Sequence, residues 1–198
     1  SNSKSCSDLV TQSYKRSFFD QNGIPVSTAR AGNVIGGGDF AVDRIIPDCV
    51  RAVASNTPIL VRNPHSIRPY QHVLEPLNAY LMIARRQSED MSFAGSYNIG
   101  PDECDCLTTG QLVDLFCEEW GDGAHREDRS EDSAPHEAQY LRLDCSRLKQ
   151  RFDWKPRWGI RDAVRLTCAW TKVYLRKGHV DMEMRREIEE FSLAGVDA

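Results

Sequence analysis

Residues 24–39 constrain the fold of this chain more than any other stretch. β-Branched side chains alternate with other residues from Ile24 to Thr28, a period of two that predicts a short strand. The stretch ends in three consecutive glycines, residues 36–38, whose backbone can adopt positive φ or pass close to a ligand. Glycines alone favour a flexible turn. The polar Asn33 favours a ligand site, because ligands of open α/β sheets collect beyond the carboxyl ends of the strands.

Helical and extended patterns alternate along the chain, which is typical of a layered α/β protein. Apolar periodicity and helix-start signals predict helices at residues 5–19, 44–54, 74–87, 108–120, 146–152 and 160–176. Short β-rich runs predict strands at residues 24–30, 59–62, 67–73, 96–100 and 140–144. We therefore expect the end of a Rossmann-type doubly wound sheet and a smaller mixed α/β lobe. The sheet domain would comprise residues 1–35 and 67–100, and the lobe residues 36–66 and 101–198.

Local signals mark the starts of two helices. Asp43 precedes the second predicted helix and is a suitable N-cap. Thr108 and Gln111 have the spacing of a capping box. In the first predicted helix, small residues such as Cys6 and Ser13 lie on the apolar stripe. They allow another helix to approach closely, so we expect a homo-oligomer formed through residues 5–19.

Composition limits the class of protein. The chain has 198 residues, 40% of them hydrophobic, and a net charge of −4, which is ordinary for a globular protein. Its apolar runs are only a handful of residues long, so we expect no membrane span. The chain begins Ser-Asn-Ser-Lys, without a Met or an apolar signal segment, and so resembles a piece of a longer protein.

The cysteines and acids exclude some partners. The seven cysteines are odd in number and scattered, which predicts free thiols in a reducing cytoplasm. Only Cys104 and Cys106 lie close together, and one Cys-x-Cys pair is a poor zinc signal, so we expect no metal. Residues 118–137 contain eight acids opposed only by Arg126 and Arg129. This run predicts a solvated loop and argues against a nucleic-acid partner, which would require a basic face.

Three arginines stand where an anion could bind. Arg44 begins a predicted helix, whose dipole favours negative charge. Arg62 and Arg68 flank a Pro-His turn near the glycines. A guanidinium binds phosphate through two parallel hydrogen bonds, so these residues are candidates for holding a phosphate. Solvent exposure alone would explain any one of them.

Three other ionisable residues have a structural and a functional interpretation. His136 follows the acidic run in Pro-His-Glu-Ala, and an isolated His is more often structural. Glu75 and Asp144 are better explained as helix-start residues than as an acid and a base. The sequence contains no visible catalytic triad and no phosphate-binding loop with a Lys.

The first four residues resemble the end of the Tyr-x-x-x-Lys motif of the short-chain dehydrogenases/reductases. The Tyr of that motif would immediately precede Ser1, and the Lys would be Lys4. Four residues are about one helical turn, which would place the two side chains on one face. In that family the Lys holds the nicotinamide ribose, and its charge favours the ionised Tyr. The resemblance therefore implies that Lys4 has the catalytic-motif role and contacts NAD.

Further motifs resemble the extended branch of this family, whose members act on nucleotide sugars. Residues 30–36 resemble the segment that follows a strand and contacts cofactor and sugar in this branch. Residues 67–75 resemble its arginine-bearing strand and the helix start that follows. Residues 97–100 resemble a late strand of the sheet, and residues 152–156 resemble the signature near the end of the chain. Longer strings are similar to the CDP-glucose 4,6-dehydratases, at residues 33–39, 62–69 and 135–138. Relatives acting on dTDP-glucose tend to have Asp-Trp where this chain has Pro69 and Tyr70.

The resemblance implies an NAD-dependent lyase that dehydrates CDP-glucose to a 4-keto-6-deoxy sugar nucleotide. Ala31 and Val34 would contact the nicotinamide. The CDP-sugar would be bound by Asn33, Arg44, Arg62, Arg68 and His136. The dinucleotide loop and the dehydration acid and base would precede Ser1, so we expect residues 1–198 alone to be inactive. The alternatives are a non-catalytic nucleotide-sugar-binding fragment, or a sister dTDP-sugar dehydratase or epimerase.

Overall fold

The computed structural model describes residues 2–129 and 140–195, which belong to two compact units. Unit 1 comprises residues 1–31, 76–99 and 144–155, and unit 2 comprises residues 32–75, 100–143 and 156–198. These boundaries differ from the predicted ones near residues 35 and 67, because the short strands next to both positions pair with each other inside unit 2. Residues 144–155, predicted to belong to the lobe, belong to unit 1 because Leu148 and Trp154 are part of its core.

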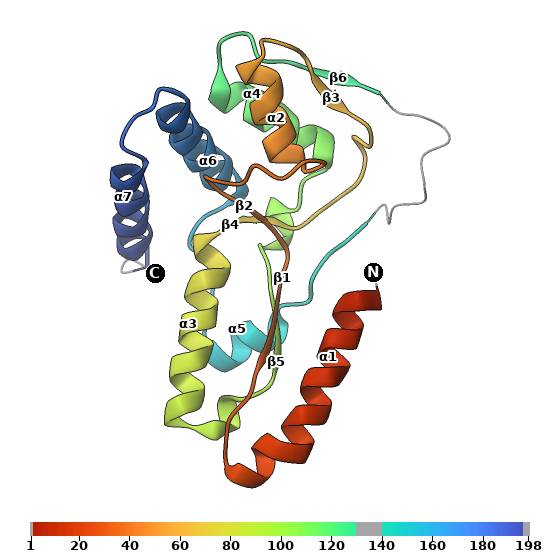
Figure 1. Ribbon diagram of the computed structural model, residues 1–198, viewed down its shortest axis with the longest axis vertical. Helices are drawn as coiled ribbons and strands as arrows, with labels where there is room; N and C mark the ends of the chain where they lie inside the picture. Colours follow the sequence, from red (N-terminus) through yellow and green to blue (C-terminus); the bar gives the residue numbers. More distant parts are fainter. Residues whose placement is uncertain (1, 130–139, 196–198) are drawn as a thin grey trace. The chain divides into compact units, whose positions relative to one another are not determined.

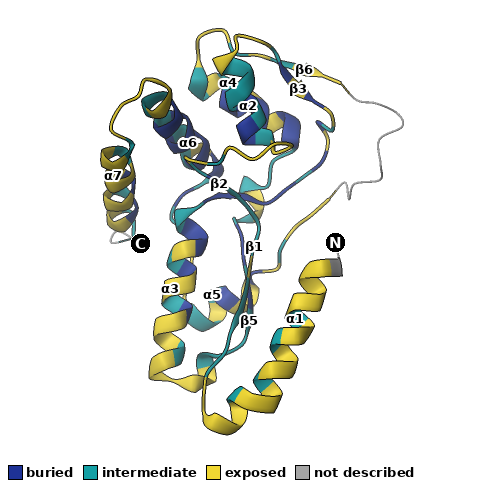
Figure 2. Ribbon diagram, in the orientation of Figure 1, coloured by how far each residue is buried: buried dark blue, intermediate teal, exposed yellow. Residues whose placement is uncertain are grey.

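Unit 1 is built on two parallel strands, β1 (Thr28–Ala31) and β5 (Ser96–Ile99) (Figure 1). Thr28 is in register with Ser96, and Ala31 with Ile99. The helices of this unit are α1 (Asn2–Tyr14), α5 (Ser146–Phe152) and most of α3 (Leu74–Glu89). Its core consists of Ala79, Ile83, Tyr97, Ile99, Leu148 and Trp154. In Figure 2, β5 alternates between intermediate and buried residues and one face of α3 is buried, whereas β1 is intermediate or exposed and most of α1 is exposed.

The strand β1 begins four residues later than predicted. A π-helical turn (Lys15–Phe19) and a 3-10 turn (Asp20–Asn22) extend α1, and Gly23 ends them at φ +64°. Residues 24–27 are not strand, and Pro25 among them has no amide to donate. Pairing begins where the Thr28 N–H donates to Gly95 O at 2.9 Å. The strand therefore starts where its partner is within reach.

Unit 2 contains two further pairs of parallel strands. β2 (Asn33–Ile35) pairs with β4 (Tyr70–His72), and β3 (Ile59–Val61) pairs with β6 (Arg126–Asp128). Its helices are α2 (Ile45–Ala54), α4 (Thr109–Trp120), α6 (Ile160–Leu175) and α7 (Val180–Leu193). The main core includes Ile46, Cys49, Ile59, Val61, Leu112, Val113, Phe116, Ala163, Val164 and Cys168.

Three sequence predictions for unit 2 were wrong in part. The predicted strand at 67–73 contracts to β4, and that at 140–144 is absent apart from a bridge between Tyr140 and Ile67. The acidic run 118–137 is not only a loop, because it contains the end of α4 and all of β6. The buried strand β3 needs a partner for its backbone hydrogen bonds. This requirement explains why an acid-rich segment is extended here.

Of the two helix starts predicted from local sequence signals, one is confirmed and the other is wrong. The capping box of α4 is confirmed, with the Gln111 N–H donating to Thr108 Oγ1 at 3.1 Å and the Thr108 N–H donating to Gln111 Oε1 at 2.9 Å. The predicted N-cap Asp43 is wrong, because Asp43 has φ +60° and Arg44 occupies the N-cap position of α2. The charge-rich residues 180–193 form α7, in which Arg186 pairs with Glu183 and Glu190, one turn before and one turn after it.

Two negative findings apply to residues 2–129 and 140–195. Among them, none of the helices has the length and apolar character required to cross a membrane. They also contain no group of three or more His, Cys, Asp or Glu side chains placed to hold a metal ion.

Candidate functional site

Lys4 lies on α1 in unit 1. One helical turn later on α1, Asp8 accepts a hydrogen bond from Arg30 Nη1 at 3.0 Å, which joins α1 to β1. The helix and the strand run in opposite directions (Figure 1). The side chain of Lys4 is exposed, and no acid in the described part of the chain pairs with its ammonium. An exposed ammonium without an ionic partner is able to donate hydrogen bonds to hydroxyl groups.

Asn33 and Val34 lie on β2 in unit 2, next to the segment that contains Arg68. The Asn33 N–H donates to Pro69 O at 2.9 Å. A Cβ on Gly32 would lie 2.6 Å from the same oxygen, so this close approach requires glycine. The structure therefore brings the two predicted substrate segments together.

The three glycines after β2 have a packing role that the sequence did not indicate. A Cβ on Gly37 would lie 2.1 Å from the Trp170 ring, and one on Gly36 would lie 3.0 Å from Val73 Cγ1. Only Gly38 of the three has positive φ, at +85°. The space beside Gly37 is thus filled by an indole of α6. A close approach to a ligand is not needed to explain this glycine.

Arg44 and Arg62 each pair with an acid of the loop 36–44, of which Arg44 is the last residue. Arg44 Nη1 lies 3.8 Å from Asp39 Oδ2, and Arg62 Nη2 lies 3.3 Å from Asp43 Oδ1. Both guanidinium groups are well exposed, so water screens these pairs and each is worth about 1 kcal/mol or less. Such weak pairs leave both arginines able to exchange a carboxylate for a phosphate.

Arg68 is buried, with 8% of its surface exposed. Its Nη1 donates to Ile67 O at 2.9 Å, and its backbone N–H donates to Leu107 O at 3.3 Å. A buried cation must be compensated by hydrogen bonds and negative charge. Arg68 lies next to β2 and β4, whereas Arg44 and Arg62 are exposed beside loop 36–44. The remaining predicted residue, His136, lies outside the described residues.

A buried ionisable cluster was missed by the sequence analysis. Glu75 Oε1 accepts hydrogen bonds from the backbone N–H groups of Arg157 and Trp158, both at 2.8 Å. Glu75 lies in the first turn of α3, as predicted, and these two hydrogen bonds are an additional role that the sequence did not indicate. His72 Nε2 lies 3.9 Å from Glu187 Oε2, and the His72 ring packs edge-on against Trp158. Glu187 stands in a highly charged segment, so its sequence context contained no signal of burial.

Burial controls the protonation of this cluster. It raises the pKa of Glu75 to about 7, although the two backbone hydrogen bonds and the Arg157 charge oppose the shift. Burial also raises the pKa of Glu187 to about 7, reinforced by Glu183 and Glu190 and opposed by Arg186 and Arg165. Burial lowers the pKa of His72 to about 4. Below neutral pH both acids are therefore largely protonated, and above pH 4 the histidine is largely neutral.

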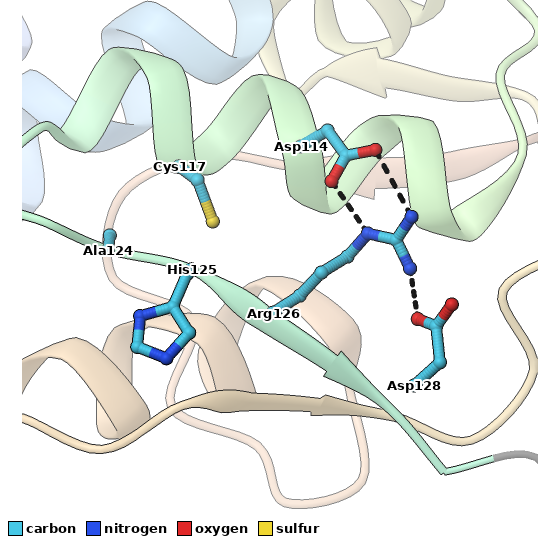
Figure 3. Close-up of a pocket in the computed structure, with 6 residues that line it drawn as sticks. All are labelled: Asp114, Cys117, Ala124, His125, Arg126 and Asp128. Carbon is cyan, nitrogen blue, oxygen red and sulfur yellow. Dashed lines mark hydrogen bonds and ion pairs between the residues drawn. The ribbon is translucent and has the colours of Figure 1, made fainter.

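An open pocket of about 520 Å³ lies elsewhere in unit 2, between α4 and β6 (Figure 3). Among the described residues that line it, the one guanidinium is that of Arg126, which is paired with Asp114 on one side and Asp128 on the other. These two carboxylates raise the pKa of Arg126. Because both acids occupy the guanidinium, the pocket is poorly suited to a phosphate. Of the predicted site residues that the structure describes, none lines it.

The strands and the polar residues at their ends define an α/β protein of the Rossmann-like class. The chain belongs to the NAD dependent epimerase/dehydratase family, whose model matches residues 2–100. A CDP-glucose 4,6-dehydratase of Salmonella typhimurium strain LT2 is 42% identical over 200 residues, covering 98% of this chain and 55% of the relative. This relative confirms the resemblance predicted from the motifs. The chain spans about half the length of the curated relative that it matches.

Solved structures support the fold assignment. A UDP-glucose-4-epimerase from Stenotrophomonas maltophila with bound NAD superposes with a TM-score of 0.72 at 17% identity, covering 86% of this chain and 54% of that one. A dTDP-glucose 4,6-dehydratase from Bacillus anthracis in complex with NAD gives 0.64 at 17% identity, covering 83% and 49%. At these identities the likeness establishes the Rossmann-like fold alone.

Proposed function

We propose that the whole protein catalyses the NAD-dependent dehydration of CDP-glucose to CDP-4-keto-6-deoxyglucose. The observation that carries this proposal is the 42% identity to a CDP-glucose 4,6-dehydratase along nearly the whole chain. The described residues fit such a site, because the segments around Asn33 and Arg68 lie side by side in unit 2. We also propose that the protein is a cytoplasmic homo-oligomer, with α1 at the subunit contact.

Unit 1 would contribute to the cofactor site. NAD, when bound, would accept a hydride from the sugar and later return it. Lys4 would hold the nicotinamide ribose and, through its positive charge, lower the pKa of a neighbouring phenol. Ala31, at the end of β1, would border the nicotinamide together with Val34.

Unit 2 would bind the nucleotide sugar. Asn33 would orient the sugar at the start of β2, where it is half-buried. Arg68 would bind the diphosphate, since its burial strengthens a charge-assisted hydrogen bond. Arg44, at the end of loop 36–44, and Arg62, directly after β3, would supply additional positive charge. His136 would contact the CDP group.

Three alternatives differ from this proposal in their chemistry. A sister epimerase would return a product of the same mass, whereas a dehydratase releases water. A dTDP-sugar dehydratase would release water from a different nucleotide. A non-catalytic nucleotide-sugar-binding protein would bind CDP-glucose without changing it.

The deciding experiment is an assay of the full-length protein with NAD and CDP-glucose, dTDP-glucose or UDP-glucose. We expect a product lighter by one water from CDP-glucose, formed at least tenfold faster than from the other two. An unchanged product mass would support an epimerase, and a preference for dTDP-glucose would support the sister dehydratase. Residues 1–198 alone should give no product, because they span only about half of the length of the dehydratase relative. Turnover by residues 1–198 above a no-protein blank would contradict this.

A further inference from the structure

The loop of residues 36–44 is fastened to α6 by aromatic side chains. Phe40 lies against Tyr174, with ring centroids 5.0 Å apart, and against Trp170 at 6.5 Å. Trp170 and Tyr174, one helical turn apart, stack at 5.4 Å with an interplanar angle of 11°. We call Phe40, Trp170 and Tyr174 the aromatic clamp. Offset stacked and tilted rings at these distances attract each other beyond the area that they bury.

Two further contacts hold the same loop in one conformation. Gly37 lies so close to the Trp170 ring that no side chain would fit between them. Arg51 of α2 donates to Phe40 O and Ala41 O, both at 3.2 Å. The loop is therefore bound to α6 through side chains and to α2 through its backbone.

The loop in turn holds the two exposed candidate arginines. Asp39 and Asp43, on either side of the clamped segment, pair with Arg44 and Arg62. Arg62 belongs to a different part of the chain, directly after β3, and is 81% exposed. Without a fixed carboxylate nearby, such an exposed guanidinium would sample many positions, and the conformational entropy lost when a ligand orders it would lower the affinity.

We propose that the aromatic clamp positions Arg44 and Arg62 for the substrate phosphates by fixing loop 36–44. The identity of the ligand in this inference rests on the proposed function. The existence of the aromatic clamp does not depend on that function. The clamp residues act through the loop, so they are positioning residues and do not themselves react.

The test uses the full-length protein with Phe40→Ala and the matched control Val42→Ala. Val42 is 75% exposed in the same loop, and no aromatic contact involves it. Hydrogen exchange of loop 36–44 without ligand should rise about tenfold in Phe40→Ala, the size of one aromatic pair, and stay unchanged in Val42→Ala. KM for CDP-glucose should rise about tenfold in Phe40→Ala with kcat within about twofold. Phe40→Tyr should keep the exchange rate of the loop and KM at their wild-type values, because Phe40 is 54% exposed and an added hydroxyl can reach water.

The outcomes separate the clamp from the proposed function. Unchanged exchange of loop 36–44 in Phe40→Ala would overturn the clamp whatever the substrate is. Faster exchange with an unchanged KM would overturn the positioning of the arginines. If the wild-type protein neither binds nor converts CDP-glucose, the proposed function fails, and the exchange measurement alone decides whether the clamp exists.

Discussion

At the scale of single residues, the three candidate anion-binding arginines differ in what surrounds them. Arg44 and Arg62 make exposed ion pairs, whereas Arg68 is buried next to the β2–β4 pair. The lower effective dielectric around Arg68 strengthens its hydrogen bonds to an anion. Of the three, Arg68 should therefore contribute most to substrate affinity.

We predict that Arg68→Ala raises KM for CDP-glucose roughly 10- to 100-fold, the value of one charge-assisted hydrogen bond. The diphosphate is the same in the ground and transition states, so kcat should change much less. Arg68→Lys should recover part of the loss, because an ammonium lacks the planar fork. Steady-state kinetics of the full-length protein measure this, with the 81% exposed Arg85→Ala as the control. If Arg68→Ala melts earlier but binds CDP-glucose as tightly as the wild type, Arg68 is structural.

A second residue-scale prediction concerns Glu75. Folding raises its pKa from 4.5 to about 7, so the folded state holds a proton that the unfolded state has lost. Its contribution to stability therefore falls as pH rises from about 4.5 to 7 and stays low above that range. Glu75→Gln cannot ionise and keeps an oxygen for the N–H groups of Arg157 and Trp158. We expect the free energy of unfolding of Glu75→Gln, relative to that of the wild type, to increase by on the order of 2–3 kcal/mol between pH 5 and pH 8.

Denaturant unfolding of the full-length protein at the two pH values measures this gain. Glu89→Gln is the control, because Glu89 is an exposed acid on the same helix. Equal pH dependence of the wild type and Glu75→Gln would show that Glu75 is ionised in the folded protein at pH 5.

At the scale of elements, loop 36–44 and α6 are joined at one tight contact. Gly37→Ala would place a methyl group against the Trp170 ring, and overpacking of this kind typically costs 1–3 kcal/mol. We predict that Gly37→Ala lowers the stability of the protein by this amount, as measured by denaturant unfolding. In a Trp170→Ala background the same substitution should cost much less, because the methyl group then enters vacated space. Additive effects of the two substitutions would refute the contact.

At the scale of the whole molecule, α1 presents an apolar surface to solvent. Leu9, Val10, Tyr14 and Phe18 are each more than half exposed, and Val10, Tyr14 and Phe18 recur at the four-residue spacing of one helix face. An apolar stripe of this length on a long helix is typical of a helix–helix contact. It supports the proposed oligomer, in which a second copy would cover the stripe.

We predict that Val10→Asp in the full-length protein shifts the assembly to a smaller species, because association would bury an unpaired carboxylate. Light scattering coupled to size-exclusion chromatography measures the mass. Gln12→Asp is the matched control, since Gln12 is also exposed on α1 but lies off the stripe. An unchanged mass for Val10→Asp, with retained helicity, would place the subunit contact elsewhere.

The features that the sequence determined by itself depend on neighbours a few residues apart. Thr108 and Gln111 cap α4 through contacts within one turn, so their spacing was sufficient. The helix α5 has the bounds expected for residues 146–152. The family was predictable for another reason, because its motifs are contiguous strings such as residues 33–39.

Only the tertiary structure decided features that depend on partners far along the chain. Glu75 meets Arg157 across 82 positions, so no local pattern could distinguish a helix-start acid from a buried acceptor of two amides. Gly37 is explained by Trp170 of α6, which no local pattern connects to it. The strand β6 forms in an acidic segment because β3 requires a partner. In each case the free energy comes from a contact whose second member is specified elsewhere in the sequence, and only folding brings the two together.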